Sequence, residues 1–257
     1  MSEVKKPVLE TKKLGITFGG LKAVQNFDLQ IYEGELVGLI GPNGAGKTTV
    51  FNMLTGVYVP TEGTVLLDGV PLNGKKPHQF VAAGVARTFQ NIRLFKQMTV
   101  IENVKAAFTK DIRYNMLDAT LRTPKFWKAE RETTEKAMDL LAICHLEDKA
   151  DVIAANLPYG QQRKLEIARA LATNMKVLLL DEPAAGMNPT ETAELLECIN
   201  TIRSRFGVAI LLIEHDMALV MNVCERIQVI DYGRTIAAGL PEEIANNPRV
   251  IAAYLGE

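Results

Sequence analysis

The sequence predicts an α/β fold in which a core with a parallel sheet is joined by an antiparallel β subdomain and an inserted helical subdomain. Four short runs are nearly all apolar, as in strands that are buried on both faces of a parallel sheet. The N-terminal segments alternate more and are separated by Gly, Asn and Pro, which is typical of antiparallel strands. The middle of the chain, about 95–155, has helical patterns and no good strand.

The predicted elements can be placed along the chain. Antiparallel strands are expected within 14–18, 24–32 and 62–72, and buried strands at 36–40, 177–180, 208–213 and 227–230. A capping box from Thr99 to Glu102 begins a helix of the middle segment, and the polar, Pro-broken residues 118–132 are expected to form a surface helix-loop-helix. Asn188 and Glu191 make a similar pair at the start of a later helix. From Gly160 onward, apolar residues recur at helical spacing and Gln, Arg and Lys occupy the other face, so an amphipathic helix is expected there; the apolar residues are Leu165, Ala168, Leu171 and Ala172.

Composition limits the classes of protein that this chain can belong to. It has 257 residues, 47% of them hydrophobic, with 29 basic and 30 acidic residues. The net charge of −1 provides no overall electrostatic footprint for nucleic acid, so no nucleic-acid partner is expected. The three cysteines are far apart in the sequence and are expected to be buried thiols. No apolar run is long enough for a membrane span, so a role at a membrane would be played from outside the bilayer.

The strongest motif is "GPNGAGKTT", which follows the predicted strand 36–40. It matches the phosphate-binding pattern G-x-x-x-x-G-K-[ST] in the strand–loop–helix setting that the pattern requires. Its glycines let successive N–H groups turn toward phosphate oxygens, Lys47 adds a positive charge, and the Thr48 hydroxyl can bind Mg²⁺. We therefore expect the nucleotide to contact Gly41, Pro42, Asn43, Gly44, Ala45, Gly46, Lys47, Thr48 and Thr49.

Polar residues at the ends of two later strands predict the rest of the site. "VLLLDEP" ends a buried strand in Asp181 and Glu182, and "LLIEHD" places His215 after the next strand. Because parallel strands present their C-terminal ends to a ligand crevice, we expect Asp181 to reach Mg²⁺, Glu182 the attacking water and His215 the γ-phosphate. Gln90 is expected to touch the metal or the water. In isolation, each of these residues would more often be a solvated or structural residue.

These motifs, in this order, resemble those of ATP-binding cassette (ABC) ATPases over essentially the whole chain. "GPNGAGKTT" is similar to the Walker A loop, "VLLLDEP" to the Walker B strand, Gln90 to the Q-loop, His215 to the switch histidine and "LPYGQQR" to the signature. The resemblance implies two cassettes that enclose two ATPs head to tail, with Gly160 and Gln161 facing the partner's γ-phosphate. It also implies that Phe18 stacks on adenine, although a core strand aromatic is the competing interpretation.

Two departures from the usual ABC pattern indicate which subfamily the chain resembles. Pro158 and Tyr159 stand where the usual signature has Ser and Gly, and Asn188 stands where the D-loop usually has Asp. With "VARTFQNIRLFKQMTVIENV" and "GRTIAAGLPEEIANNPRVIAAYLGE", the chain resembles the G-type cassette of high-affinity branched-chain amino acid importers. That resemblance implies ATP and Mg²⁺, a second, F-type cassette (a homodimer being the alternative), two membrane permeases and, indirectly, a periplasmic binding protein. It places the chain on the cytoplasmic side, peripheral to the inner face of the cell membrane.

The whole chain, 1–257, is expected to be a single nucleotide-binding domain. Its expected parts are a β and P-loop core to about 92, a helical subdomain over about 93–160, a resumed core over about 161–238 and a tail at 239–257. Three alternative functions stay open at this stage. They are another ABC transporter ATPase such as a lipopolysaccharide exporter subunit, a chromosome or repair ATPase, and a soluble translation factor.

Overall fold

The computed structural model describes residues 6–108 and 115–255. The chain forms two compact units, which are described separately below. Unit 1 comprises Met1–Arg87, Met175–Pro183 and Ile202–Glu257, and unit 2 comprises Thr88–Asn174 and Ala184–Thr201. No helix among the described residues combines the length and the apolar character needed to cross a membrane.

The larger sheet of unit 1 has six strands in the order β10-β9-β3-β8-β7-β6. Strands β9, β3, β8, β7 and β6 are parallel, and β10 pairs antiparallel with β9. Every residue of β3, β7 and β8 is buried, so the prediction of buried strands from the four apolar runs is confirmed. The bounds are β3 Leu36–Ile40, β6 Val85–Arg87, β7 Val177–Asp181, β8 Ala209–Ile213, β9 Arg226–Asp231 and β10 Arg234–Gly239.

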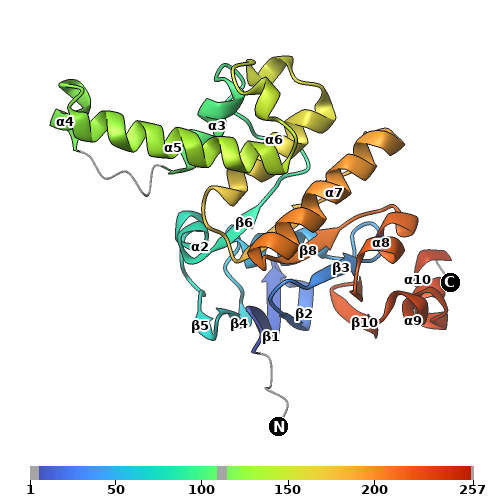
Figure 1. The fold of residues 1–257 in the computed structure, drawn as a ribbon. Coiled ribbons are helices and arrows are strands. Elements are labelled where there is room, and N and C mark those ends of the chain that lie inside the picture. Colours follow the sequence, from blue (N-terminus) through green and yellow to red (C-terminus); the bar gives the residue numbers. More distant parts are fainter. Residues whose placement is uncertain (1–5, 109–114, 256–257) are drawn as a thin grey trace, which may run out of the picture. The chain divides into compact units, whose positions relative to one another are not determined.

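The smaller sheet of unit 1 has four antiparallel strands in the order β2-β1-β4-β5, as the alternating N-terminal segments predict. Its bounds are β1 Leu9–Phe18, β2 Leu21–Ile31, β4 Glu62–Leu67 and β5 Val70–Pro71. One hydrophobic core joins this sheet to helix α1 (Lys47–Leu54) and to the larger sheet, through residues such as Phe27, Phe51 and Leu179. The other helices of unit 1 are α2 Pro77–Ala83, α8 Met217–Val223, α9 Pro241–Ala245 and α10 Pro248–Leu255 (Figure 1).

Unit 2 is helical, and its described part contains no strand, as predicted for the middle of the chain. Helix α5 extends well beyond α3 and α6, and α4 lies at its far end (Figure 1). Helix α7 (Pro189–Phe206) continues from unit 2 into unit 1. The other elements are α3 Val100–Ala107, α4 Met116–Thr120, α5 Pro124–Ile143, α6 Tyr159–Leu171 and the 3₁₀ turns Glu147–Lys149 and Ala154–Asn156.

Both predicted capping boxes are present. The Thr99 N–H donates to Glu102 at 2.8 Å and the Glu102 N–H donates back to the Thr99 hydroxyl at 3.3 Å. At α7, the Glu191 N–H donates to the Asn188 side chain at 3.0 Å, and the Asn188 N–H donates to the Glu191 carboxylate at 3.1 Å. These bonds satisfy N–H groups that a helix start leaves without partners.

Candidate nucleotide-binding site

The glycine-rich loop leads from β3 into α1, and two of its glycines have backbone positions that exclude other residues. Gly46 is the N-cap of α1, with a left-handed φ of 108°. A Cβ on Gly41 would lie 1.9 Å from the carbonyl oxygen of Ile230 on β9. The loop therefore approaches the sheet more closely than a side chain would allow, and α1 directs its positive N-terminal end toward the loop.

Lys47 lies at the start of α1, and its side chain folds back over the loop. Its ammonium group donates hydrogen bonds to the carbonyl oxygens of Gly41 at 2.5 Å and Pro42 at 2.9 Å. Burial lowers the pKa of Lys47, while the negative charges of Glu182 and Asp181 oppose this shift. The cation therefore lies near Asp181, the last residue of β7, and Glu182, which follows it. A lysine in a phosphate-binding loop neutralises part of the phosphate charge.

Asp181, the last residue of β7, is buried and has a cationic partner that the sequence analysis missed. Arg87, at the end of the neighbouring strand β6, donates to the Asp181 carboxylate at 2.6 Å and to the Asn52 amide oxygen at 2.8 Å. Its guanidinium group also lies over the Phe51 ring, 5.4 Å from the centroid. Arg87 therefore fixes the orientation of the predicted metal ligand relative to α1.

Glu182 and His215 lie together, although they come from the ends of different strands. The His215 Nε2 atom is 2.5 Å from the Glu182 carboxylate. The Glu182 N–H donates to the Ile213 carbonyl at 2.9 Å, which ties the end of β7 to the end of β8. Glu182 has a left-handed φ of 47°, a strained conformation for a residue with a side chain. The backbone conformation of Glu182 and the His215 imidazole together fix the orientation of this carboxylate.

The site suits a magnesium ion that is held mainly by phosphate and water. Thr48 is exposed at the first turn of α1, and Asp181 is the nearby buried carboxylate. Among the described residues, no group of three or more His, Cys, Asp or Glu side chains could hold a metal by itself. In phosphate sites Mg²⁺ commonly takes one or two protein oxygens and completes its octahedron with phosphate and water, so these residues fit it.

Phe18 ends β1 as an exposed aromatic residue and not as part of the core. Its ring makes an edge contact with Tyr58, with 5.2 Å between the centroids. Tyr58 was not predicted, because nothing in its sequence neighbourhood distinguishes it. The pair gives unit 1 an exposed aromatic surface suited to stacking on a base.

In unit 2, the signature turn begins α6 with Pro158 as its N-cap, and no side chain caps this end. Tyr159 is exposed, whereas Gly160 packs so closely against α7 that a Cβ would lie 3.1 Å from the Glu191 carboxylate. The Gln161 side-chain oxygen is buried without a hydrogen-bond partner. The N-terminal end of α6 could bind an anion through its free N–H groups, but the Glu191 carboxylate packs against it and opposes that binding.

Arg163 is fully buried in α6 and connects that helix to the predicted Q-loop. It donates to the backbone carbonyls of Phe89 at 2.5 Å and Gln90 at 2.8 Å, and to the Glu166 carboxylate at 2.7 Å. The helical periodicity of α6 alone places Arg163 on its polar face and does not distinguish it from the other polar residues there. Gln90, Gly160 and Gln161 all belong to unit 2, so their contribution to the phosphate site in unit 1 stays a prediction.

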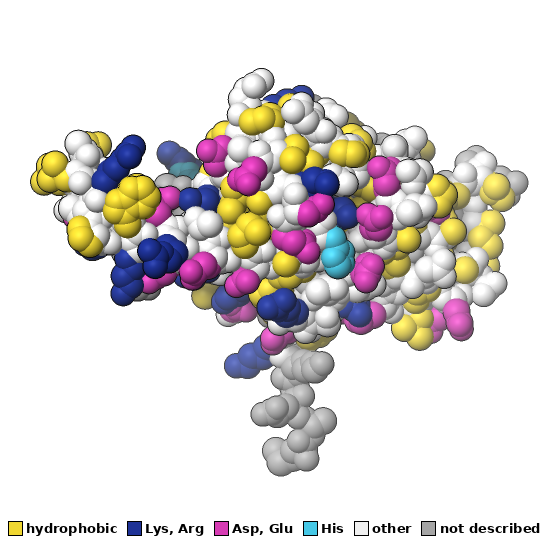
Figure 2. All heavy atoms as spheres, turned by 45° about the horizontal axis from the view of Figure 1, so that its top comes forward, with side chains coloured by type: hydrophobic (Ala, Val, Ile, Leu, Met, Phe, Trp, Pro, Cys, Tyr) yellow, Lys and Arg dark blue, Asp and Glu magenta, His cyan; other side chains and the backbone are white. Residues whose placement is uncertain are grey.

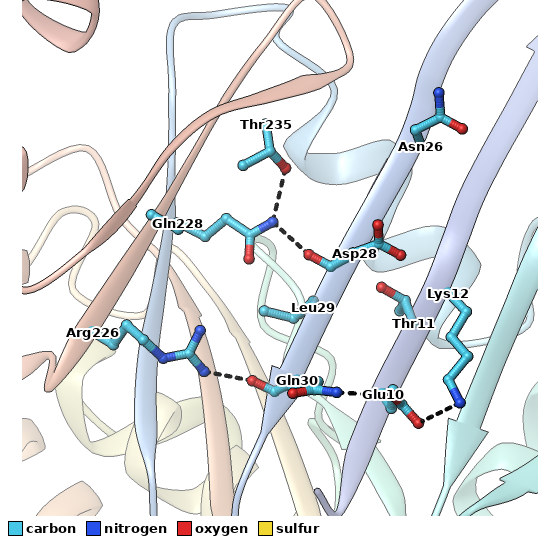
Figure 3. Close-up of a pocket in the computed structure, with 11 residues that line it drawn as sticks. Glu10, Thr11, Lys12, Asn26, Asp28, Leu29, Gln30, Arg226, Gln228 and Thr235 are labelled. Carbon is cyan, nitrogen blue, oxygen red and sulfur yellow. Dashed lines mark hydrogen bonds and ion pairs between the residues drawn. The ribbon is translucent and has the colours of Figure 1, made fainter.

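A polar groove of about 510 Å³ lies elsewhere in unit 1, between the strands of the two sheets (Figure 3). Two of its charged side chains form an ion pair, with Lys12 lying 3.2 Å from Glu10, and the Glu10 carboxylate also accepts from the Gln30 amide at 2.9 Å. Arg226 bonds to the Gln30 carbonyl. None of the residues predicted for nucleotide binding lines this groove. The groove is therefore separate from the predicted nucleotide-binding residues.

A phosphate loop between a buried strand and a helix, followed by a helical unit that carries a signature-like turn, defines the class of ABC-type P-loop ATPases. The family described as "ABC transporter" matches residues 24–185, and the family described as "Branched-chain amino acid ATP-binding cassette transporter" matches residues 234–257. The chain belongs to the ABC transporter family. It is accordingly an Mg²⁺-dependent ATPase subunit of a transporter, with ATP and Mg²⁺ as its ligands.

Curated relatives cover nearly the whole chain. The high-affinity branched-chain amino acid transport ATP-binding protein LivG of Escherichia coli is 51% identical over 98% of this chain and 98% of the relative. BraF of Pseudomonas aeruginosa, which has the same descriptive name, is 50% identical over 98% and 99%. The lipopolysaccharide export system ATP-binding protein LptB of Haemophilus influenzae is 34% identical over 97% and 98%.

Solved structures show the same fold. An ATP-binding cassette of an ABC transporter in its ADP conformation aligns with a TM-score of 0.84 and 31% identity, over 98% of this chain and 99% of the other. A nucleotide-free cassette aligns with a TM-score of 0.83 and 32% identity, over 98% and 100%. The predicted fold class is therefore confirmed.

Proposed function

We propose that this chain is the ATP-hydrolysing subunit of an importer for branched-chain amino acids. The observation that carries the proposal is identity of about one half, over essentially the full length, to two transport proteins that are named for these substrates. The C-terminal match to the branched-chain family agrees with it, since that segment includes β10, α9 and α10. A lipopolysaccharide exporter is less well supported, because the exporter relative is 34% identical.

The residues of unit 1 have distinct proposed roles in hydrolysis. The loop N–H groups and Lys47 bind the phosphates, and Thr48 and Asp181 hold Mg²⁺. When bound, ATP–Mg²⁺ supplies the phosphoryl group and part of the charge neutralisation. Glu182 orients a water and accepts its proton. His215, whose Nε2 atom is 2.5 Å from that carboxylate, is proposed to contact the γ-phosphate and to help position the water. Gln90 is proposed to reach the same water or metal, and Phe18 to stack on the base.

The proposed assembly has a second cassette of a different type, a pair of membrane permeases and, through them, a periplasmic binding protein. A homodimer of this chain is the alternative. A solved ATP-binding cassette with 25% identity and a TM-score of 0.74 is dimeric with ADP and phosphate bound, which supports pairing of cassettes. The chain would then act as a peripheral protein on the cytoplasmic face of the membrane.

Affinity purification of the tagged chain from native membranes, combined with an uptake assay, tests this function. We expect permeases and a second cassette to co-purify, and a strain without this chain to lose uptake of leucine, isoleucine and valine. Wild-type protein should restore uptake, and Lys47→Ala should not. Recovery of lipopolysaccharide export proteins, with unchanged amino acid uptake, would contradict the proposal and favour the exporter.

A further inference from the structure

Helix α4 and the first two turns of α5 form an arm of unit 2, defined here as residues 115–131. None of the residues of α4 is buried. The buried residues of α5 are Ala137, Leu141 and Ile143, all in its second half. In Figure 1 α4 lies at the end of α5 that is farther from α3 and α6. The arm therefore does not form part of the core of unit 2.

Large apolar side chains are nevertheless concentrated on this arm. The exposed fractions are 85% for Met116, 71% for Leu117, 73% for Leu121 and 54% for Trp127. In Figure 2 hydrophobic and basic side chains, with a few acidic ones, lie together at the left of the view, where Figure 1 places α4. Such a group of exposed apolar side chains marks an interaction surface more often than single exposed residues do.

The arm has a defined turn that presents these side chains. The Asp118 N–H donates to the Asn115 side chain at 2.8 Å, which caps α4. The Thr123 hydroxyl donates to the Asp118 carboxylate at 3.0 Å, and Thr123 also caps α5, where Pro124 occupies the first turn. Both helix starts are thus fixed by side-chain hydrogen bonds.

The charge of the arm differs from that of the whole chain. The arm has a net charge of +2, or +1 when the next residue, Glu132, is included, whereas the chain carries −1. Its charged residues are Arg122, Lys125, Lys128 and Arg131, against Asp118 and Glu130. Lys105 already binds Glu130 at 2.7 Å, and Lys125 lies 3.6 Å from Asp118. Trp127 and Arg131 are one helical turn apart, so a cation and the indole share one side of α5.

We propose that this arm binds the interfacial region of an anionic lipid bilayer. A tryptophan is suited to the headgroup level, leucine and methionine to the acyl boundary, and lysine and arginine to lipid phosphates. An apolar groove on a protein partner would cover the leucines but would not require the surrounding cations. The inference goes beyond the proposed function and does not depend on which substrate is transported.

Trp127 is the only tryptophan of the chain, so its fluorescence reports on the arm alone. The full-length chain is mixed with vesicles of phosphatidylglycerol and phosphatidylcholine in equal parts, or of phosphatidylcholine alone. We expect a blue shift of Trp127 emission and co-sedimentation with the anionic vesicles, both weakened by added salt. The double variant Leu117→Ser, Leu121→Ser should reduce binding by about tenfold or more, because two leucine side chains no longer enter the interface.

Matched variants distinguish vesicle binding by the arm from nonspecific binding through other exposed apolar residues. Val70→Ser changes an exposed apolar residue of β5 in unit 1 and should leave vesicle binding unchanged. Because Leu117 and Leu121 are exposed, their substitution should leave thermal unfolding and ATPase activity unchanged, so lost binding would not reflect misfolding.

Three results would overturn the proposal. They are the absence of both blue shift and sedimentation with anionic vesicles, equal and salt-insensitive binding to phosphatidylcholine, and a blue shift obtained only with purified permease in detergent. The last result would assign the arm to a protein partner. None of these results bears on amino acid uptake, so failure here is distinguishable from failure of the proposed function.

Discussion

In the candidate site, Glu182 is held in place both by its backbone and by its side chain. Its φ of 47° is unfavourable for a residue with a Cβ, yet its N–H is bonded to Ile213 and its carboxylate contacts His215. Strain of this kind persists only where the surrounding structure holds it. The arrangement is consistent with a carboxylate whose direction matters for chemistry.

Glu182→Gln should retain ATP binding and lose hydrolysis by about 10²–10⁴-fold, because an amide cannot accept the proton of the attacking water. Steady-state ATPase rates with the cognate partners, together with nucleotide binding by fluorescence, test this. Glu225→Gln, which changes an exposed carboxylate paired with Arg203 at 2.9 Å, is the control. Wild-type turnover in Glu182→Gln would remove Glu182 from the mechanism.

The buried thiol of Cys224 should make stability depend on alkaline pH. Burial, with the nearby charge of Glu225, raises the pKa of Cys224 from 9.0 to about 12. Between these values the unfolded chain loses the proton first, so this contribution to stability is complete below pH 9 and is lost as pH rises toward 12. Urea unfolding from pH 8 to 10.5 should show a smaller decline for Cys224→Ala than for wild type. Parallel declines would contradict the assignment.

At the residue scale, the carboxylates of the site could be predicted from the sequence, but the side chains that bind them could not. Asp181 and Glu182 could be placed because they end an apolar run that must be a buried strand. The pairing of Asp181 with Arg87 could not be foreseen, because it depends on β6 lying beside β7, and β6 has only three residues. Periodicity carries little information over so short a strand.

At the scale of elements, side chains of α6 hold the backbone of the segment that follows β6 by hydrogen bonds. Arg163 binds the carbonyls of Phe89 and Gln90, and Glu166 accepts from the Arg93 N–H at 3.2 Å. Sequence periodicity identified α6 and its buried stripe, and Leu165, Ala168 and Leu171 are indeed buried. It could not show that charged residues on the presumed polar face are buried too, because that requires the packing of the loop against the helix.

Arg163→Met should destabilise the protein by about 3–5 kcal/mol, since it leaves the buried carboxylate of Glu166 without its cation. Arg163 and Glu166 have side chains exposed by 0% and 3%. The double variant Arg163→Met, Glu166→Met should recover part of the loss, because no unpaired charge remains. Urea denaturation of the three variants measures this. A double variant as unstable as the sum of the single variants would refute the buried pair.

The resemblance to ABC ATPases implies that the loop after the Q-loop contacts a membrane permease, and a core role for Phe95 is the alternative. The Phe95 ring is exposed, which favours the permease contact. The Phe95 N–H donates to the Asn103 side chain at 2.9 Å, and Asn103 donates back to the Phe95 carbonyl at 3.0 Å. Because the ring itself is exposed, Phe95→Ala should preserve folding and basal ATPase activity but reduce transport-coupled hydrolysis in the assembled importer. Unchanged coupling, with intact folding and assembly, would exclude Phe95 from the permease contact.

At the scale of the whole molecule, the altered signature affects how strongly each of the two ATP sites of a cassette dimer would bind γ-phosphate. The serine hydroxyl of the usual signature is replaced by Pro158, and no side chain caps α6. The Glu191 carboxylate packs against Gly160 at that helix end. A hydrogen bond to a charged group is worth roughly 1.5–3 kcal/mol, so the site that this turn completes should hold γ-phosphate less firmly.

We therefore expect a heterodimer with one strong ATP site, in which the phosphate loop of this chain is completed by a partner cassette with an intact signature. The Glu182 of this chain would serve that strong site, whereas the equivalent glutamate of the partner would serve the weaker one. In reconstituted importer, Glu182→Gln should reduce transport more than the matching substitution in the partner, and this chain by itself should dimerise weakly with ATP. Replacing Pro158 and Tyr159 by Ser and Gly should narrow the difference, because the hydroxyl donor is restored. Equal losses from the two single variants, or a larger loss from the partner's, would show that the two sites work alike and that the altered turn only packs against its neighbour.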